Sequence, residues 1–292
     1  MQRETRPADT VAGVTESAVR GTGDPVLVVH GTPGGIDVAE AMGRFLPSDR
    51  FRVVTMSRPG YLGSTLDPEH ASLDDEADRF AAVLDGYGIE RAAVLAWSGG
   101  APAAYRFAVR HPERVRSLVV AAGLTGRWHP PHVTPVEWVV THTVAGAAAA
   151  RIAAGLAPAV VIRVAEAGVS SLRRRRLDEH VRDVLADPVR RAFVLDLATT
   201  GNTSGRHRPG WRNDVRNLGA VEDLGLRDVR TPTLLVHGDA DTDVVPAHSL
   251  RASVQIPGAE LVTLPGGTHF ALWDHHEASA LQERVREHLS RG

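Results

Sequence analysis

Residues 92–102 read Ala92-Ala93-Val94-Leu95-Ala96-Trp97-Ser98-Gly99-Gly100-Ala101-Pro102. The apolar run before Ser98 predicts a buried strand, and the alanine-rich segment after it predicts a helix with Pro102 in its first turn. Ala96 and Gly100, both small, stand two positions before and after the serine. A strand, a sharp turn and a helix with serine at the apex form a nucleophile elbow, whose crowded backbone accepts only small flanking residues. The usual Gly-x-Ser-x-Gly is matched here as Ala-x-Ser-x-Gly, and the pattern predicts that Ser98 forms a covalent intermediate.

Two other predicted strands also end in loops that carry catalytic residue types. Residues 25–35 read PVLVVHGTPGG, an apolar strand followed by His-Gly and a glycine-rich turn. Residues 233–241 read TLLVHGDAD, an apolar strand followed by an acidic loop. A further strand over 259–265 leads into residues 266–270, which read GGTHF. The order along the chain is therefore glycine-rich loop, serine, acid and histidine.

This set of motifs resembles the alpha/beta hydrolase family, whose catalytic residues follow one another in the order serine, acid, histidine. The resemblance runs from Pro25 to Leu289, although only the motif loops are specific. It implies an α/β fold with a mostly parallel central sheet, flanking helices, and a helical cap inserted before the last two strands. In such sheets ligands bind at the carboxyl ends of the strands, where all of these loops are expected to meet.

The order of the predicted strands and helices indicates where the core and the cap begin and end. Predicted strands at 51–57, 92–97 and 115–122 alternate with predicted helices at 73–87 and 100–109, which is typical of parallel strands with crossover helices. Residues 10–23 predict a leading hairpin, and residues 125–229 show helical patterns only. We therefore predict an alpha/beta hydrolase core over 1–124 and 230–292, and a helical cap insertion over 125–229.

The resemblance implies a role for each candidate catalytic residue. A serine hydroxyl needs a neighbouring base, and His269, one of 14 histidines, has the Gly-Gly-x-His-Phe context of the family's catalytic histidine. Asp241 stands three residues after the strand-end Gly238, which is the family's position for the acid. Asp243 stays open as a second choice, because one extra residue precedes the proline that follows.

Backbone N–H groups at two loops are expected to form the oxyanion hole. Gly99, directly after the nucleophile, supplies one. In the glycine-rich loop Pro33 has no N–H, so Thr32 is the preferred donor and Gly31 the next. The alternative is a simple glycine-rich turn. A phosphate-binding loop is a poorer interpretation, because neither G-x-x-x-x-G-K-[ST] nor G-x-G-x-x-G occurs.

Composition excludes several classes of function. The formal net charge of -2 gives no electrostatic basis for binding nucleic acid or an anionic membrane. All 33 basic residues are arginine, so no lysine is available for a Schiff base. The absence of cysteine excludes thiolate catalysis and disulfides.

Residues 1–23 are polar and lack a signal-peptide core, so a cytoplasmic location is expected. Residues 139–164 are apolar but contain arginines and a proline, which favours buried helices over a membrane span.

These features predict a cofactor-independent serine hydrolase, without metal, that acts on a small-molecule ester, lactone or thioester. The motifs resemble those of proline iminopeptidase-like and cofactor-free haloperoxidase-like esterases, but Thr32 and the Trp-Ser-Gly-Gly order depart from the peptidase pattern. An aminopeptidase, an acyltransferase and a catalytically inactive ligand-binding protein stay open as alternatives. Haloalkane dehalogenases of this fold use an aspartate as nucleophile, which Ser98 argues against. Trp97, Trp128 and Trp138 are candidates to line the substrate pocket, although aromatic core packing explains each equally well. The sequence does not indicate an oligomeric state.

Overall fold

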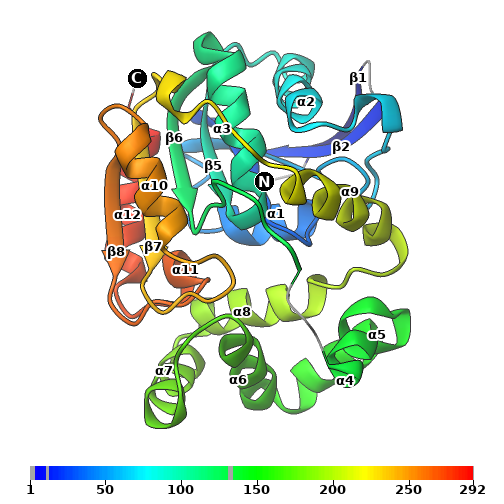
Figure 1. The fold of residues 1–292 in the computed structure, drawn as a ribbon, viewed down its shortest axis with the longest axis vertical. Coiled ribbons are helices and arrows are strands. Elements are labelled where there is room, and N and C mark those ends of the chain that lie inside the picture. The colour runs from blue at the N-terminus through cyan, green and yellow to red at the C-terminus, as the bar shows by residue number, and fades with distance from the viewer. Residues whose placement is uncertain (1–3, 11–12, 131–133, 292) are drawn as a thin grey trace.

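The computed structural model describes residues 4–10, 13–130 and 134–291, which form an eight-stranded sheet covered by helices and a helical layer beyond one end of the strands (Figure 1). The strand order is β1-β2-β4-β3-β5-β6-β7-β8. The strands are β1 (Glu4–Thr10), β2 (Gly13–Arg20), β3 (Asp24–Val29), β4 (Phe51–Met56), β5 (Ala92–Trp97), β6 (Val115–Ala121), β7 (Thr233–Gly238) and β8 (Glu260–Leu264).

The sheet is parallel from β4 to β8 and antiparallel at the edge formed by β1 and β2. This confirms the predicted mostly parallel sheet. The predicted hairpin is present but begins earlier than residue 10, because β1 and β2 pair from Glu4 opposite Val19 to Thr10 opposite Gly13. Val11, which contributed to that prediction, lies outside the described residues.

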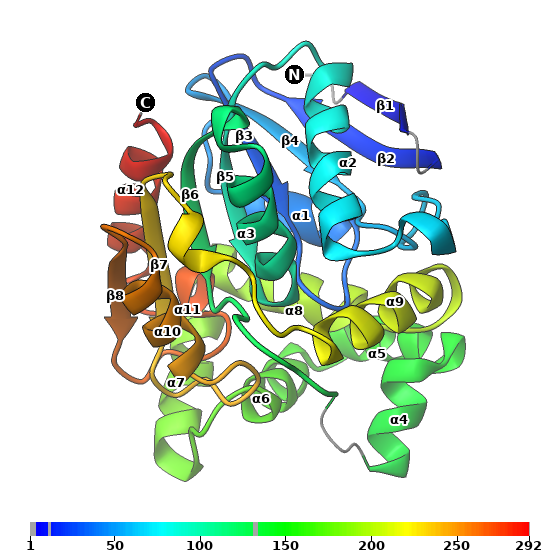
Figure 2. The same cartoon turned by 45° about the horizontal axis from the view of Figure 1, so that its top comes forward.

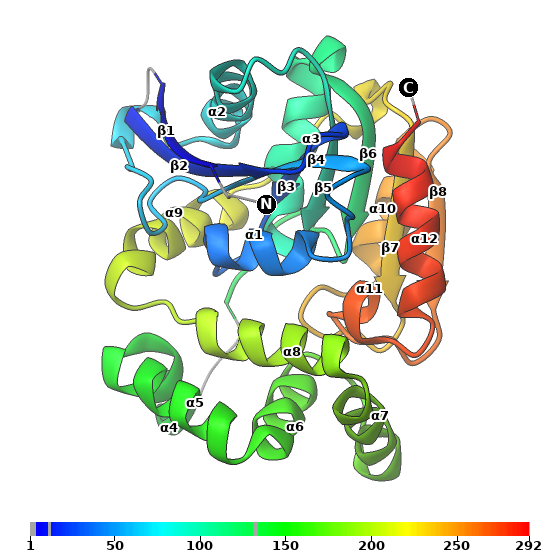
Figure 3. The ribbon, with the colours of Figure 1, turned by 180° about the vertical axis from the view of Figure 1, so that it is seen from behind.

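Helices cover both faces of the sheet. On one face lie α2 (Leu73–Gly86), α3 (Ala101–Arg110) and α10 (Ala247–Gln255), which are packed in a single apolar cluster with Leu27, Val94 and Leu235. On the other face lie α1 (Ile36–Gly43), α11 (Ala271–Asp274) and α12 (Ala278–Leu289), as seen from behind in Figure 3. Each strand of the centre is therefore buried on both sides, which explains its continuous apolar sequence.

Between β6 and β7 the structure contains six α-helices and no strand among the described residues. They are α4 (Pro135–His142), α5 (Val144–Leu156), α6 (Pro158–Gly168), α7 (Arg174–Ala186), α8 (Pro188–Thr200) and α9 (Arg208–Gly219). Figure 2 shows this helical layer, here called the cap, below the ends of the strands, with α9 returning toward the core. The helical character of this segment is confirmed, while the limits 125 and 229 stay a prediction.

The helices within 139–164 are less buried than the sequence predicted. Val144, Ile152 and Leu156 expose more than half of their surface, because they lie on the side of α5 that faces away from the core. Among the described residues, none of the helices combines the length and the apolar character that a membrane crossing requires.

Candidate active site

Ser98 lies at the predicted sharp turn between β5 and α3. Its backbone has a φ of 53°, in the left-handed region that non-glycine residues rarely adopt, and the residue is 4% exposed. The turn packs closely against the end of β3, since a side chain at Gly100 would collide with the carbonyl oxygen of His30. Ala96 lies in the fully buried strand just before the turn. Steric crowding therefore explains why small residues flank Ser98, and strain of this kind is typical of functional turns.

His269 and Asp241 meet beside this turn. Asp241 Oδ2 lies 2.7 Å from His269 Nδ1, and both residues are buried. The other carboxylate oxygen, Oδ1, accepts the backbone N–H of Asp243 at 2.9 Å and of Val244 at 3.0 Å. His237, at the end of β7, brings Nε2 to 3.2 Å from Asp241 Oδ2. These contacts with the loop after β7 hold the carboxylate of Asp241 in the position in which it binds His269.

Trp97 joins His269 to the serine turn. Its ring centroid lies 5.1 Å from that of His269, and its Nε1–H donates to the backbone oxygen of His269 at 3.2 Å. Because Trp97 directly precedes Ser98, these contacts hold the histidine loop against the strand that carries the serine.

Asp243 lies on the other side of the imidazole. Its Oδ2 is 3.4 Å from His269 Nε2, the nitrogen that Asp241 does not contact. Among the described residues no hydrogen bond joins the Ser98 hydroxyl to His269. Catalytic hydrogen bonds are often long or poorly aligned in enzymes without bound substrate. The two aspartates that the sequence left in competition therefore contact different nitrogens of the same ring.

These contacts shift the pKa values of the cluster. Burial lowers the pKa of His269, but the charge and hydrogen bond of Asp241 and the charge of Asp243 raise it to about 9. Burial raises the pKa of Asp241, but His269 and His237 bring it down to about 2. For Asp243 burial dominates, and its pKa lies above the usual value. At neutral pH the favoured state is thus an imidazolium beside an ionised Asp241.

The two predicted oxyanion donors lie next to each other. A side chain at Gly99 would collide with that of Thr32, and one at Gly31 would come within 3.1 Å of Ser98 Cβ. Among the residues the structure describes, none accepts a hydrogen bond from the backbone N–H of Thr32. The loop after β3 therefore lies against the residue that follows Ser98, and its Thr32 N–H is not bound by any described residue.

A buried network of charged side chains fixes the side chain of Thr32. The side-chain hydroxyl of Thr32 donates to Asp214 Oδ2 at 2.6 Å. Arg58 holds the same carboxylate with both terminal nitrogens, at 2.8 and 3.0 Å, and it binds Glu76 through Nε at 2.5 Å. Tyr61 donates its hydroxyl to Asp214 at 2.7 Å. Arg58, Glu76, Asp214 and Tyr61 are at most 2% exposed.

This network connects three parts of the chain, since Glu76 lies on α2 and Asp214 on α9 of the cap. The local sequence contains no signal that would connect Arg58 with these partners. Acidic residues on helices are usually exposed, and nothing in the local pattern marks Glu76 or Asp214 as buried.

The three tryptophans predicted to line a pocket lie in different places. Trp97 is buried against His269. Trp128 is partly buried and packs at 6.0 Å on Trp211 of α9. Trp138 is 50% exposed and stacks on His142 at the end of α4. The structure therefore brings only Trp97 into contact with the catalytic candidates.

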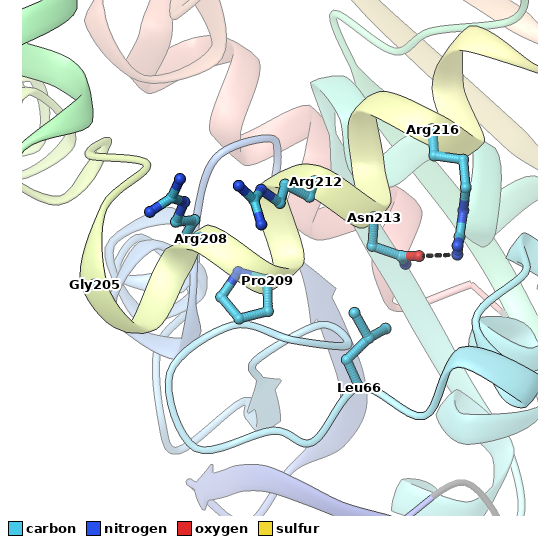
Figure 4. A pocket seen from close by; sticks show the side chains of 7 residues that line it. All are labelled: Leu66, Gly205, Arg208, Pro209, Arg212, Asn213 and Arg216. Carbon is cyan, nitrogen blue, oxygen red and sulfur yellow. Dashed lines mark hydrogen bonds between the residues drawn. The ribbon is translucent and has the colours of Figure 1, made fainter.

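A separate surface cavity of about 390 Å³ lies on the outer side of α9 (Figure 4). It is lined by Leu66, Gly205, Arg208, Pro209, Arg212, Asn213 and Arg216. None of the residues predicted for catalysis borders it. This cavity is therefore distinct from the cluster around Ser98.

Comparisons with known proteins agree with the fold. A family model described as alpha/beta hydrolase fold matches residues 24–276. The uncharacterized hydrolase YcgS of Bacillus subtilis is 27% identical over 294 residues, which cover 96% of each chain. A 2-hydroxy-6-oxononadienedioate/2-hydroxy-6-oxononatrienedioate hydrolase of Pseudomonas putida is 29% identical over 266 residues, which cover 87% of this chain and 84% of the relative.

One solved structure is similar over almost the whole length. It is an alpha/beta hydrolase fold protein from Nakamurella multipartita, 38% identical, with a TM-score of 0.95 and coverage of 98% of this chain and 99% of that one. The family model also spans the loops of Ser98, Asp241 and His269. The chain therefore belongs to the alpha/beta hydrolase family and is an enzyme of the hydrolase class.

Proposed function

We propose that the enzyme is a serine hydrolase that cleaves a small-molecule ester, lactone or thioester through an acyl-enzyme intermediate. The observation that carries this proposal is the strained Ser98, at a φ of 53°, whose neighbour Trp97 packs on a histidine that is hydrogen-bonded at 2.7 Å to a buried aspartate. Nucleophile, base and orienting acid are the three groups that acyl transfer to serine requires.

Each proposed step uses a group described above. The Ser98 hydroxyl attacks the substrate carbonyl carbon while its proton moves to His269 Nε2, and Asp241 holds the proton on Nδ1. The N–H groups of Gly99 and Thr32 stabilise the resulting oxyanion. The tetrahedral intermediate expels the alcohol or thiol, which takes the proton from Nε2. Water then attacks the acyl-enzyme and gives a proton to Nε2, and Ser98 recovers that proton as the acid leaves.

The surroundings of Ser98 support a small, partly apolar acyl group. Leu124, Leu218 and Val244 form a buried apolar cluster with Trp128 against it. Leu124 donates its N–H to the Ser98 backbone oxygen at 3.3 Å, so this cluster adjoins the nucleophile. Ser98, Asp241 and His269 are each at most 4% exposed, which favours a small molecule over a folded protein as substrate.

A second candidate substrate class comes from the relatives. Two Pseudomonas putida relatives are named as hydrolases of 2-hydroxy-6-oxo acids and of 2-hydroxymuconate semialdehyde. Such compounds belong in the same substrate screen as esters, lactones and thioesters. An aminopeptidase, an acyltransferase that passes the acyl group to an alcohol, and an inactive binding protein are the remaining alternatives.

The direct test is intact-mass detection of a fluorophosphonate adduct, because this probe reacts only with an activated serine. One adduct is expected on the wild type and none on Ser98→Ala. Ser253→Ala is a matched control, since Ser253 lies on α10 and its hydroxyl only bonds the Leu250 carbonyl. An unlabelled but folded wild type, or an adduct that persists on Ser98→Ala, would overturn the proposal.

The labelling rate is expected to rise with pH up to about 9 and then level off. The pKa of His269 is about 9, so a larger fraction of the imidazole becomes neutral, and able to accept a proton, with each step toward that value. Below it the rate should increase roughly tenfold per pH unit. Second-order labelling rates from pH 6 to 10 test this, and a rate that is flat over that range contradicts the assigned base.

Gly99→Ala is expected to reduce the labelling rate by about 10²-fold, the usual effect of losing one oxyanion donor. The new methyl group would collide with the Thr32 side chain and push the two loops apart. Gly155→Ala is the control, because no atom lies within 4 Å of a side chain added there. Equal rates for the two variants would show that the contact between Gly99 and Thr32 does not matter for the reaction.

A further inference from the structure

Three ligand-type side chains from three helices converge at the junction between cap and core. They are Glu166 on α6, His180 on α7 and Asp274 on α11. One nitrogen or oxygen atom of each lies within 4.8 Å of the others. His180 Nε2 is 3.3 Å from Glu166 Oε2 and 3.2 Å from Asp274 Oδ2. The cluster lies outside the proposed catalytic residues.

The two carboxylates are buried and only partly hydrogen-bonded. Glu166 is 0% exposed and Asp274 is 1% exposed. Neither oxygen of Glu166 accepts a hydrogen bond of good geometry, and the same holds for Asp274 Oδ1, although Glu166 Oε2 lies 3.3 Å from the imidazole of His180. A buried carboxylate is unfavourable unless a cation or hydrogen bonds replace the hydration that burial removes. His180 offers one partner to both carboxylates, and a cation held among the three side chains would satisfy the remaining oxygens.

The distances between the three side chains are compatible with a coordination sphere, although the contact of His180 with Asp274 also meets the criterion for a hydrogen bond. Hydrogen bonds between an imidazolium and a carboxylate are normally about 2.7–2.9 Å long. Two ligand atoms that are each about 2.0–2.1 Å from one ion lie roughly 3.0 Å apart in octahedral and 3.4 Å apart in tetrahedral geometry. The observed separations of 3.2 and 3.3 Å fall within that range.

Charge and ligand type select the ion. Two carboxylates and one neutral imidazole balance a divalent cation and leave no net charge in the buried site. Imidazole together with carboxylate ligands suits first-row transition ions such as Zn²⁺, whereas Mg²⁺ and Ca²⁺ prefer oxygen ligands alone. His180 is 11% exposed at its side chain and gives the site an edge toward solvent.

We propose that Glu166, His180 and Asp274 form a binding site for one divalent transition-metal ion that links the cap to the core. The linked part of the core carries the proposed base. The hydroxyl of Thr268, next to His269, donates to Asp274 Oδ2 at 2.9 Å and accepts the N–H of Phe270 at 3.1 Å. Hydrogen bonds of this kind to a ligating carboxylate orient it for the metal. The ion is thus expected to stabilise both α6–α7 and the loop around His269.

The test is Zn²⁺ binding by the untagged full chain, which needs no enzymatic activity. After removal of metals with a chelator, calorimetric titration at pH 7.5 and elemental analysis after dialysis are expected to give one Zn²⁺ per chain. At a 100-fold excess of free Zn²⁺ over Kd, the melting temperature should rise by roughly 5 °C. A wild type that binds no Zn²⁺, or whose melting temperature is unchanged by it, overturns the proposal.

Variants show whether the ion binds at this cluster. Glu166→Gln and His180→Gln keep the side-chain size and are each expected to weaken Zn²⁺ binding at least 100-fold. His276→Gln is the control, because His275, His276 and Glu277 form the other group in the described structure able to hold a metal. Binding lost only in His276→Gln, or retained in both cluster variants, contradicts the assignment. If one cluster variant does not fold, the other and the wild-type titration still decide the question.

Discussion

Asp241→Asn is expected to lower the rate of fluorophosphonate labelling of Ser98 by ~10⁴-fold, which is the usual effect of this change in a serine triad. The asparagine oxygen still accepts the N–H groups that Asp243 and Val244 donate to Oδ1, so the loop keeps its shape. Its amide group, however, would face His269 Nδ1 in place of the carboxylate oxygen that lies 2.7 Å away. The neutral imidazole then carries its proton on Nε2 instead of Nδ1. Because Nε2 is the nitrogen that has to accept the serine proton, the ring no longer acts as the base. The measurement is the second-order labelling rate at pH 9, with circular dichroism to verify folding.

Asp243→Asn is the matched control for that prediction, because its carboxylate contacts the opposite nitrogen of His269 at 3.4 Å. The charge of Asp243 raises the pKa of His269, so its removal should lower that pKa. The labelling rate at pH 7 is then expected to increase, whereas the rate at pH 9 changes little. A large loss of rate in Asp243→Asn, with a nearly normal Asp241→Asn, would assign the role of the acid to Asp243.

The strands and the order of the motifs could be predicted from the sequence because they depend on local patterns. β5 extends over the predicted residues 92–97, since a continuous apolar run can only be buried on both faces. The small residues around Ser98 predicted a crowded turn, and in the structure a side chain at Gly100 would indeed collide with the carbonyl oxygen of His30.

Contacts between distant segments could not be predicted in the same way. Glu166 and His180 look like ordinary polar residues of the cap, and their proximity to Asp274 depends on how α6 and α7 pack on the core. The spacing of these three residues along the chain matches no metal-binding motif, so the sequence could not indicate that they form one site. Likewise, the sequence could not show that Asp241 and Asp243 contact different nitrogens of His269, because this depends on the conformation of the loop.

Arg58→Met is expected to reduce the free energy of unfolding by ~3–5 kcal/mol, the usual cost of removing one partner from a buried ion pair. The arginine is fully buried and binds Asp214 at 2.8 Å and Glu76 at 2.5 Å. Methionine fills part of the volume but leaves two carboxylates facing each other without a cation. Urea denaturation at pH 7.5 measures the loss. The labelling rate is also expected to fall, because Arg58 and Asp214 together hold the hydroxyl of Thr32.

The pH dependence and two controls separate this effect from simple loss of packing. Burial raises the pKa of Glu76 and the charge of Arg58 opposes that increase, so in Arg58→Met the pKa of Glu76 should rise further above its unfolded value and the folded state should bind a proton more readily. The loss of stability relative to the wild type should therefore shrink as the pH falls and grow as the pH rises.

Arg284→Met is the surface control, because Arg284 pairs with Glu260 at 2.8 Å in an exposed position, where such pairs contribute about 0–1 kcal/mol. The triple variant Arg58→Met/Glu76→Gln/Asp214→Asn should recover part of the stability, since it removes the unpaired charges. A deficit that stays constant with pH and is not relieved in the triple variant would mean that Arg58 stabilises the fold by its packing alone.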